Sequence, residues 1–333
     1  MLSGWFSKAG DRLPMHAQPL ISIVIVTRDR KAELKKCLQG VSVQNYKNIE
    51  TLVIDNKSED GTAEMINNEF PAVNLIRLDR NLGCPSGRNV GALNSRGEII
   101  FFLDDDCIID VNAIDNAVPY FISDEKLAVV TPQIIEPESD IVLFATGDSL
   151  RYMHNFIGFS AIRRSVFETF GLYPTDFMYG AEETDLAIRI LNADGHILYV
   201  PQVKVFHYPA KNRNRNWEME QKLLNSIQVL LKYAPGERLL AGILVKPLTF
   251  LPQALHFHSV LGWIKAVIKI PALVIKILIT RQRIPLGWKP FILGEFLMNN
   301  SITAPEDLPQ IDEMQLTASM FRSTLFKGRR FRK

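Results

Sequence analysis

The chain has 333 residues, of which 47% are hydrophobic and 22% charged, and this balance excludes a disordered or fibrous protein. A formal net charge of only +2 gives no sign of a nucleic-acid-binding protein. Three cysteines without a CxxC spacing exclude a disulfide framework and a cysteine-rich zinc site. Because residues 1–18 also lack the continuous apolar stretch of a secretory signal, we expect a cytoplasmic protein.

Charge is distributed unevenly along the chain. Residues 1–210 contain 19 Lys and Arg against 28 Asp and Glu, whereas residues 211–333 contain 19 against 8. An acidic front part and a basic rear part predict two different tasks.

The front of the chain alternates between short β-branched segments and polar helical segments. Strands are predicted at 21–27, 50–55, 73–78 and 98–103, and helices at 30–40, 60–69 and 86–94. This βαβαβαβ order predicts an α/β fold with a mostly parallel, doubly wound sheet. In such sheets ligands bind beyond the carboxyl ends of the strands. Polar clusters follow three of the predicted strands, so we expect them to converge on one crevice: Thr27 to Asp29, Asp55 with Asn56, and Asp104 to Asp106.

Beyond about residue 110 the pattern becomes mixed. Strands are predicted at 127–135, 159–163, 196–200 and 203–206, and a helix at 183–192. The rear of the chain is helical and apolar from 239 to 296, and we expect that helical stretch to be broken by prolines at five positions: Pro247, Pro252, Pro271, Pro285 and Pro290.

Three carboxylates, Asp104 to Asp106, come directly after a hydrophobic strand. Adjacent carboxylates repel and raise one another's pKa, so the cluster favours a bound cation. Oxygen ligands suit Mg²⁺ or Mn²⁺, usually shared with phosphate oxygens. The structural alternative is a solvated acidic loop.

A second acidic group, Glu182, Glu183 and Asp185, falls in the first turn of a predicted helix. Acids there also stabilise a helix N-terminus, which is the structural alternative. The order of acidic strand end, acidic helix start and then His207 after a strand is more specific than either group alone.

Together these segments resemble the inverting family 2 glycosyltransferases, which use nucleotide-diphosphate sugars and have the GT-A, or nucleotide-diphospho-sugar transferase, fold. A rhamnosyltransferase-like subgroup is one option. The resemblance covers about residues 21–209. It rests on the following segments: Ser22–Thr27, Val53–Thr62, Asn81–Gly83, Gly87–Gly91, Phe102–Asp106, Gly158–Arg164, Phe170–Pro174, Glu182–Leu186 and Tyr199–His207.

The resemblance implies a nucleotide pocket lined by Thr27 and Asp55, with Asp55 accepting a hydrogen bond from the base. It implies that Arg88 contributes to nucleotide or phosphate binding. Asp104 and Asp105 would face the ribose and the metal shell.

For the metal, the resemblance implies that Asp106 is a direct ligand of Mg²⁺ or Mn²⁺ and that His207 reaches the metal or the diphosphate; a satisfied histidine on a strand edge is the alternative. The family's acidic pair is usually Glu-Asp, and its second member is the catalytic base. Here the pair is Glu182-Glu183, so the base falls on Glu183, and the assignment between the two stays open. Asp185 is expected to cap the helix or contact the acceptor.

The rear segment 259–283 is apolar but contains three lysines close to one helical face, and Pro271 near its centre. These features make a membrane-spanning helix expensive and favour a helix in the interface of an anionic membrane. The similar stretch 239–257 precedes it. A helix packed on the catalytic domain is the alternative.

We therefore expect an N-terminal extension (1–19), a GT-A catalytic domain (20–210), a helical, membrane-associating segment (211–300) and a basic tail (301–333). The expected function is metal-dependent transfer of one sugar from a nucleotide-diphosphate donor to a polysaccharide or lipid-linked acceptor at the inner membrane face, without a nucleic-acid partner. A non-catalytic sugar-nucleotide-binding or scaffold protein is the alternative from another class. A nucleotidyltransferase is less favoured, because no glycine occurs in the loop from Thr27 to Arg30.

Overall fold

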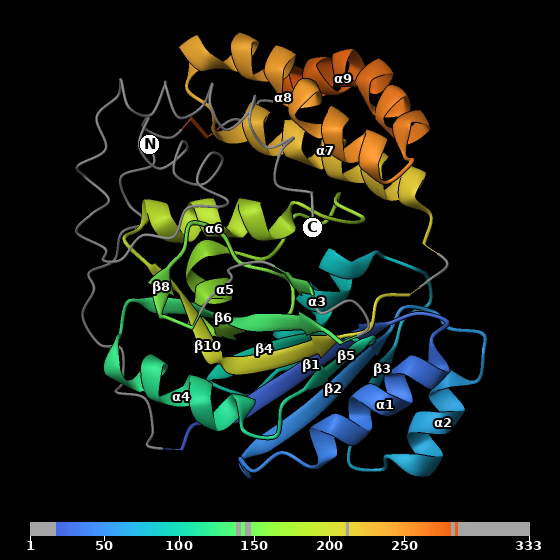
Figure 1. The fold of residues 1–333 in the computed structure, drawn as a ribbon, viewed down its shortest axis with the longest axis vertical. Helices are drawn as coiled ribbons and strands as arrows, with labels where there is room; N and C mark the ends of the chain where they lie inside the picture. Colours follow the sequence, from blue (N-terminus) through green and yellow to red (C-terminus); the bar gives the residue numbers. More distant parts are fainter. Residues whose placement is uncertain (1–17, 138–140, 144–147, 211–212, 281–283, 286–333) are drawn as a thin grey trace.

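The computed structural model describes residues 18–137, 141–143, 148–210, 213–280 and 284–285, which form a sheet flanked by helices (Figure 1). The basic tail expected over 301–333 lies outside these residues, as do 286–300 of the helical segment and all but the last two residues of the N-terminal extension.

Within the described residues the strands form one mixed sheet with the main order β3-β2-β1-β4-β9-β6-β10-β5, and β7 and β8 pair with β6 and β10. Neighbours from β3 to β4 are parallel, β9 runs antiparallel between β4 and β6, and β10 is parallel to β6. The α/β fold with a mostly parallel doubly wound part is thus confirmed. The strands are β1 Ile21–Thr27, β2 Ile49–Asp55, β3 Asn74–Arg77, β4 Ile99–Asp104, β5 Cys107–Ile109, β6 Leu127–Glu136, β7 Ile141–Leu143, β8 Arg151–Tyr152, β9 Ala161–Arg163 and β10 His196–His207.

Helices cover both faces of this sheet. One face packs on α1, α2 and α4 through a core that includes Leu34, Ile66 and Phe121. The other face packs on α3, α5 and α6 through a core that includes Ala92 and Leu186. The bounds are α1 Lys31–Ser42, α2 Thr62–Glu69, α3 Cys84–Asn94, α4 Ala113–Ser123, α5 Ser165–Phe170 and α6 Glu182–Asn192.

The register of the sheet gathers polar residues at one edge. Thr27 pairs with Asp55 across β1 and β2, and Val26 pairs with Asp104 across β1 and β4. In the antiparallel pair of β10 and β5, His207 lies opposite Cys107, next to the acidic triplet. The expected convergence of strand ends is therefore confirmed, and β10 brings His207 to the same place.

One predicted feature of the sheet is wrong. Residues 196–200 and 203–206 form one continuous strand, β10, rather than two. The pairing with β6 shifts register between Val200 and Lys204. A bulge of this kind absorbs Pro201, which has no N–H to donate to the ladder, without ending the strand.

Three C-terminal helices, α7 Arg215–Tyr233, α8 Gly236–His256 and α9 Val260–Thr280, form a further layer on the outer side of α6 (Figure 1). A third apolar cluster joins α6 to this layer and includes Ile188, Leu223, Leu230 and Ile270.

The expectation that prolines break these helices is wrong for the described ones. Pro247 and Pro252 lie inside α8, and Pro271 lies inside α9. A proline removes one backbone hydrogen bond, but packing against neighbouring helices can keep the chain helical. A side-chain hydrogen bond near this proline also joins the two helices, because the Trp263 indole N–H of α9 donates to the Pro247 carbonyl of α8 at 2.8 Å.

Helix α3 approaches β1 so closely that only glycine fits at Gly91, where a Cβ would lie 2.2 Å from Val24 Cγ1. We expect Gly91→Ala to lower the free energy of unfolding by ~1–3 kcal/mol, the usual cost of overpacking a core. Urea unfolding measures this change. Gly236→Ala is the matched control, because a Cβ at Gly236 meets nothing within 4 Å. Equal effects of the two substitutions would contradict this account of the helix contact.

Candidate active site

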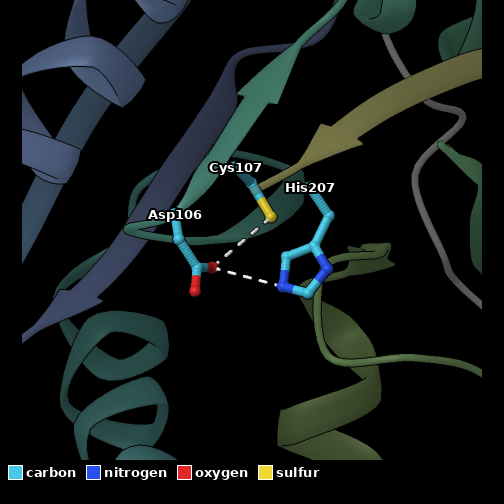
Figure 2. A group of neighbouring side chains, drawn as sticks. All are labelled: Asp106, Cys107 and His207. Atoms are coloured by element: carbon cyan, nitrogen blue, oxygen red, sulfur yellow. Dashed lines mark hydrogen bonds and ion pairs between the residues drawn. The ribbon is translucent and has the colours of Figure 1, made fainter. Parts of the chain in front are cut away.

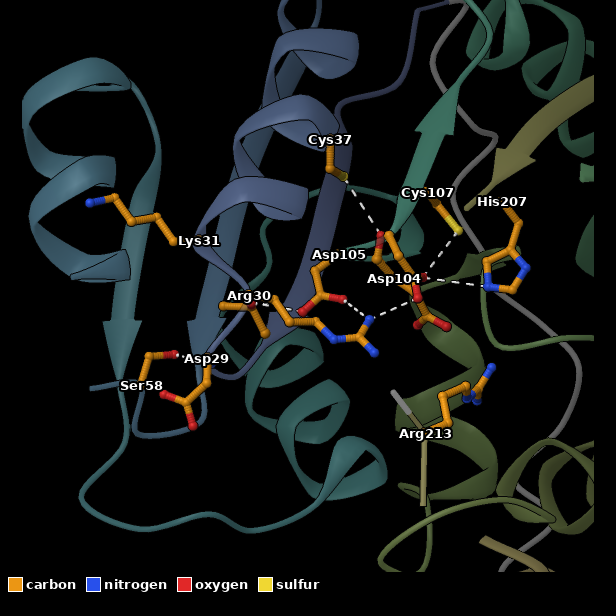
Figure 3. A network of polar contacts seen from close by, with 12 residues as sticks. Asp29, Arg30, Lys31, Cys37, Ser58, Asp104, Asp105, Cys107, His207 and Arg213 are labelled. Atoms are coloured by element: carbon orange, nitrogen blue, oxygen red, sulfur yellow. Dashed lines mark hydrogen bonds and ion pairs between the residues drawn. The ribbon is translucent and has the colours of Figure 1, made fainter. Parts of the chain in front are cut away.

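The acidic triplet lies where β4 ends, and it is paired with side chains from the end of β1 (Figure 3). Thr27 Oγ1 donates to Asp105 Oδ2 at 2.8 Å. Arg30 Nη1 bridges Asp105 Oδ1 at 2.9 Å and Asp106 Oδ2 at 2.7 Å. Burial raises the pKa of Asp105 to about 7, and Arg30 opposes that shift. In this structure, the cation that the carboxylates share is therefore a guanidinium.

Sequence reasoning did not single out Arg30. A signal was present, because Arg30 follows the end of β1 by three residues, and the polar residues beyond the strand ends were expected to converge. The sequence left open which of the two basic residues near this strand end, Arg28 or Arg30, would reach the triplet.

His207 and Asp106 face each other across the same site (Figure 2). His207 Nε2 lies 3.5 Å from Asp106 Oδ1, and His207 Nδ1 lies 3.2 Å from Glu136 Oε1. The imidazole ring stacks on Phe159, with ring centroids 5.5 Å apart. When His207 Nδ1 donates to Glu136, the lone pair of His207 Nε2 points toward Asp106 Oδ1. Because both Nε2 and Oδ1 are then acceptors, a cation between them would suit both.

The donor set fits a hard divalent cation in part. Ligand atoms of Asp106, Cys107 and His207 lie within 4.8 Å of one another. Carboxylate oxygen and imidazole nitrogen are suitable ligands for Mn²⁺ or Mg²⁺, whereas a thiol is a soft ligand. Burial also raises the pKa of Cys107, so the thiol keeps its proton. Asp106 and His207 could therefore hold such an ion, and Cys107 lines the site.

Arg88 of α3 joins the two acidic groups predicted from the sequence. Its Nη2 donates to Asp104 Oδ1 at 2.8 Å, and its Nη1 donates to Glu182 Oε1 at 3.1 Å and Glu183 Oε1 at 3.2 Å. The Arg88 side chain is only 4% exposed. Gly158 lies against the guanidinium, where a Cβ would come within 2.2 Å of Arg88 Nη2. Arg88, which was expected to contact the nucleotide, thus links the end of β4 to the start of α6.

The glutamate pair begins α6 and has two different environments. The Glu182 side chain is 4% exposed and that of Glu183 is 17% exposed. The pKa of Glu182 is raised mainly by burial and also by the negative charge of Glu183. Among the described residues, Glu182 Oε2 has no hydrogen-bond partner. Glu183 is thus the more exposed of the two glutamates.

Asp185 does not cap α6, so that half of the expectation is wrong, whereas a contact with the acceptor stays a prediction. Its buried carboxylate binds Lys232 Nζ at 2.9 Å and the Tyr233 hydroxyl at 2.9 Å, both on α7, and Arg189 Nη2 at 2.7 Å. Asp185 therefore attaches α6 to the C-terminal layer.

Asp55 lies at the end of β2 with its carboxylate buried. Oδ1 accepts from the Ser58 backbone N–H at 2.7 Å. Oδ2 has no hydrogen-bond partner among the described residues, although Arg77 Nε lies 3.6 Å away. Because a buried carboxylate oxygen without a donor is costly, Oδ2 suits a ligand that brings an N–H group.

The sheet and the acidic strand end define the class of the protein, the GT-A nucleotide-sugar transferase fold. A mannosyltransferase, PcManGT from Pyrobaculum calidifontis, solved with GDP-Man and Mn²⁺, is similar over 98% of this chain and 93% of that chain, with a TM-score of 0.55 and 18% identity. TarS from S. aureus, solved with UDP-GlcNAc, is similar over 77% of this chain and 81% of that chain, with a TM-score of 0.57 and 14% identity.

Residues 22–179 match the family described as Glycosyl transferase family 2. An uncharacterized glycosyltransferase of Haemophilus influenzae is 36% identical over 87 residues, which are 26% of this chain and 29% of that protein. Glycosyltransferase AglE of Haloferax volcanii is 34% identical over 94 residues, which are 27% of this chain and 31% of that protein. The matches thus span less than a third of these two relatives. The recognition made from the motifs is confirmed.

We expect Arg88→Gln to lower the free energy of unfolding by ~3–5 kcal/mol at pH 8, because removing one partner of a buried ion pair leaves uncompensated charge. The loss should shrink at pH 5. When folding raises the pKa of a carboxyl group, that group destabilises the folded protein as the pH rises above its pKa in the unfolded chain. Glu182 is such a group even with Arg88 present. Protonation of the carboxylates at lower pH removes that penalty.

Urea unfolding of wild type and variant at both pH values measures this effect. Arg164→Gln is the control, because Arg164 pairs with Glu168 at the surface, and such pairs contribute at most ~1 kcal/mol. A pH-independent loss for Arg88→Gln would show that the charge link is not the cause.

Proposed function

We propose that this protein is an inverting, metal-dependent glycosyltransferase that moves one hexosyl or deoxyhexosyl group from a nucleotide-diphosphate donor to a hydroxyl of a polysaccharide or lipid-linked acceptor. The observation that carries the proposal is that one buried arginine, Arg88, joins the acidic end of β4 to the glutamate pair of α6. The family match over residues 22–179 supports sugar transfer. A relative over 61% of this chain, 22% identical, is an O-antigen biosynthesis protein of Myxococcus xanthus, and this supports a cell-envelope acceptor.

The donor would bind across the ends of β1, β2 and β4. Asp55 Oδ2 would accept a hydrogen bond from the base, beside Thr27, and Asp104 and Asp105 would face the ribose. Asp106 and His207 would hold Mg²⁺ or Mn²⁺, which neutralises negative charge on a departing diphosphate. Two of the solved structures that resemble this chain contain GDP-Man with Mn²⁺ and UDP-GlcNAc, which supports a nucleotide sugar as donor.

Transfer would form a bond from the acceptor oxygen to the anomeric carbon and break the bond from that carbon to the diphosphate oxygen. Glu183 would take the acceptor's proton, since it is the more exposed glutamate and a carboxylate must be within reach of the hydroxyl. Attack from the face opposite the diphosphate inverts the anomeric centre. Arg88 would keep Glu183 aligned by its hydrogen bond from Nη1.

The proposal is tested by thermal shift with a panel of nucleotide sugars, with and without Mn²⁺, because a ligand that binds only the folded state raises its stability. Transfer to membrane-extracted acceptors is then measured with the donor that binds. Binding without transfer would favour the non-catalytic sugar-nucleotide-binding alternative.

We expect Asp106→Ala to abolish transfer and the Mn²⁺-dependent part of the donor-induced thermal shift, while the protein stays folded. The physical reason is the loss of the carboxylate that faces His207. Asp115→Ala, an exposed acid on α4, is the charge-matched control and should behave like wild type. Full activity of Asp106→Ala in excess chelator would overturn the metal assignment.

We expect Glu183→Gln to keep donor binding and to lower turnover by at least about 10²-fold, since proton removal contributes roughly 10²–10⁴-fold. Glu182→Gln is its matched partner, in the same turn and bound to the same arginine. Steady-state kinetics of both variants decide between them. If Glu182→Gln is inactive and Glu183→Gln turns over normally, the base lies one residue earlier.

We further propose peripheral association with the inner face of the cell membrane through α8 and α9. Many of the side chains exposed on these helices are large and apolar, and exposed apolar patches mark contacts with a membrane or a partner protein. By length and composition, the stretch Arg238–His256 of α8 could cross a membrane: its mean hydropathy is 1.3, and only 11% of it is buried inside the protein. An interfacial position is favoured, because α8 contains Lys246 and two prolines and packs along the rest of the layer. The exposed set includes Leu240, Leu244, Leu248, Leu255, Leu261, Ile264, Ile268, Ile275, Leu278 and Ile279.

We expect the protein to sediment with anionic vesicles, to be loosened but not released by high salt, and to dissolve in mild detergent. Each lysine near the surface contributes ~1 kcal/mol that salt screens, whereas apolar burial persists. Ile268→Glu, at a side chain 72% exposed on α9, should weaken sedimentation. Leu93→Glu, 69% exposed on α3, is the control and should not. A full-length protein that stays in solution at low salt would contradict the proposal.

A further inference from the structure

The turn that leads into α6 has an unusual backbone. Gly180 and Ala181 both have left-handed conformations, with φ of +77° and +71°, and Glu182 follows directly. An L-residue such as alanine disfavours this region, and only a few short polar residues and glycine visit it routinely. Interactions from outside the turn must therefore hold Ala181 in place.

Those interactions come from α7. Asn225 Nδ2 donates to the Tyr179 carbonyl at 3.0 Å and to the Gly180 carbonyl at 2.9 Å, and Asn225 is buried. Lys222 lies one turn earlier on the same helix, where its ammonium is 5.2 Å from the centre of the Tyr179 ring. A Cβ at Gly180 would lie 2.8 Å from Lys222 Cγ, so the turn rests directly on α7.

The other end of the same helical turn is also attached to α7, through Asp185 with Lys232 and Tyr233. Glu182 and Glu183 thus lie between two attachments to one helix, and Arg88 contacts both glutamates from the side of the sheet. Helix α7 begins at Arg215, beyond the family-matched residues 22–179.

We propose that Asn225 is a positioning residue for the reaction. Its hydrogen bonds to two backbone carbonyl oxygens hold the left-handed turn before α6, and the turn sets the direction in which the Glu183 side chain points. This inference rests on the proposed function, because it gives Glu183 the role of base. It assigns to the C-terminal layer a part in the chemistry besides its place at the membrane. Helices α8 and α9, which continue through their prolines, then act as the support of α7.

The test uses Asn225→Leu in the full chain, which keeps the approximate shape and removes both donated hydrogen bonds. Asn216→Leu is the matched control, because the Asn216 side chain also lies on α7 but bonds the Gly262 N–H of α9. Hydrogen exchange read by mass spectrometry follows the segment 178–186. We expect exchange there to rise by about tenfold in Asn225→Leu, the effect of losing one or two buried hydrogen bonds. In Asn216→Leu the rise should fall on 258–264 instead.

Kinetics provide a second readout. In Asn225→Leu the turnover should fall by about tenfold, while the KM for the donor and the affinity for Mn²⁺, measured by titration, stay within about twofold of wild type, since only the base is displaced. Adding Ala181→Gly to Asn225→Leu should recover several-fold of the lost turnover, because glycine adopts the left-handed conformation at little cost.

The outcomes separate the two proposals. Unchanged exchange over 178–186 in Asn225→Leu, or a turnover loss that Ala181→Gly does not recover, overturns the positioning role. A wild-type chain that transfers no sugar from any donor overturns the proposed function, whereas the exchange experiment still reports whether Asn225 holds the turn.

Discussion

Repulsion among buried carboxylates is the constraint on which the rest of the structure depends. The acidic end of β4 and the glutamate pair of α6 meet in one site, where the side chains of Asp105, Asp106 and Glu182 are buried, and unpaired buried charges would cost several kcal/mol each. Two arginines compensate for them. Arg30 serves Asp105 and Asp106, and Arg88 serves Asp104 and both glutamates. Burial raises the pKa of Asp105 and of Glu182 despite these arginines, and the charge of a neighbouring carboxylate adds to each shift.

The two arginines have different surroundings, and this separates their tasks. Arg88 is fully enclosed between α3, β4, α6 and Gly158, so it is part of the frame of the site. Arg30 lies on a loop after β1 with a side chain 29% exposed. A partly exposed side chain on a loop can change position without disturbing the core, whereas an enclosed one cannot leave without unfolding its surroundings.

The C-terminal layer is both an outer surface and an inner support. Its outer side presents apolar side chains of α8 and α9, and its inner side attaches α6 through Asp185 and the preceding turn through Asn225. A layer with these two faces places the proposed base and the proposed membrane contact on opposite sides of one helix, α7. An acceptor held at a bilayer would thus meet a site whose geometry is maintained from the same layer.

Sequence by itself determined the alternation of strands and helices up to β4. It also placed the end of each of those strands within about two residues and identified the carboxylates at the strand ends. It could do so because burial and periodicity are local properties of a strand or helix. The tertiary structure alone decided that β10 is one strand, that α8 and α9 continue through their prolines, and which cation serves which acid. Arg88 and Glu182 are 94 residues apart, and Asn225 is 45 residues from Gly180. Pairing over such distances depends on the order of strands and the packing of helices, and no local pattern in the chain encodes it.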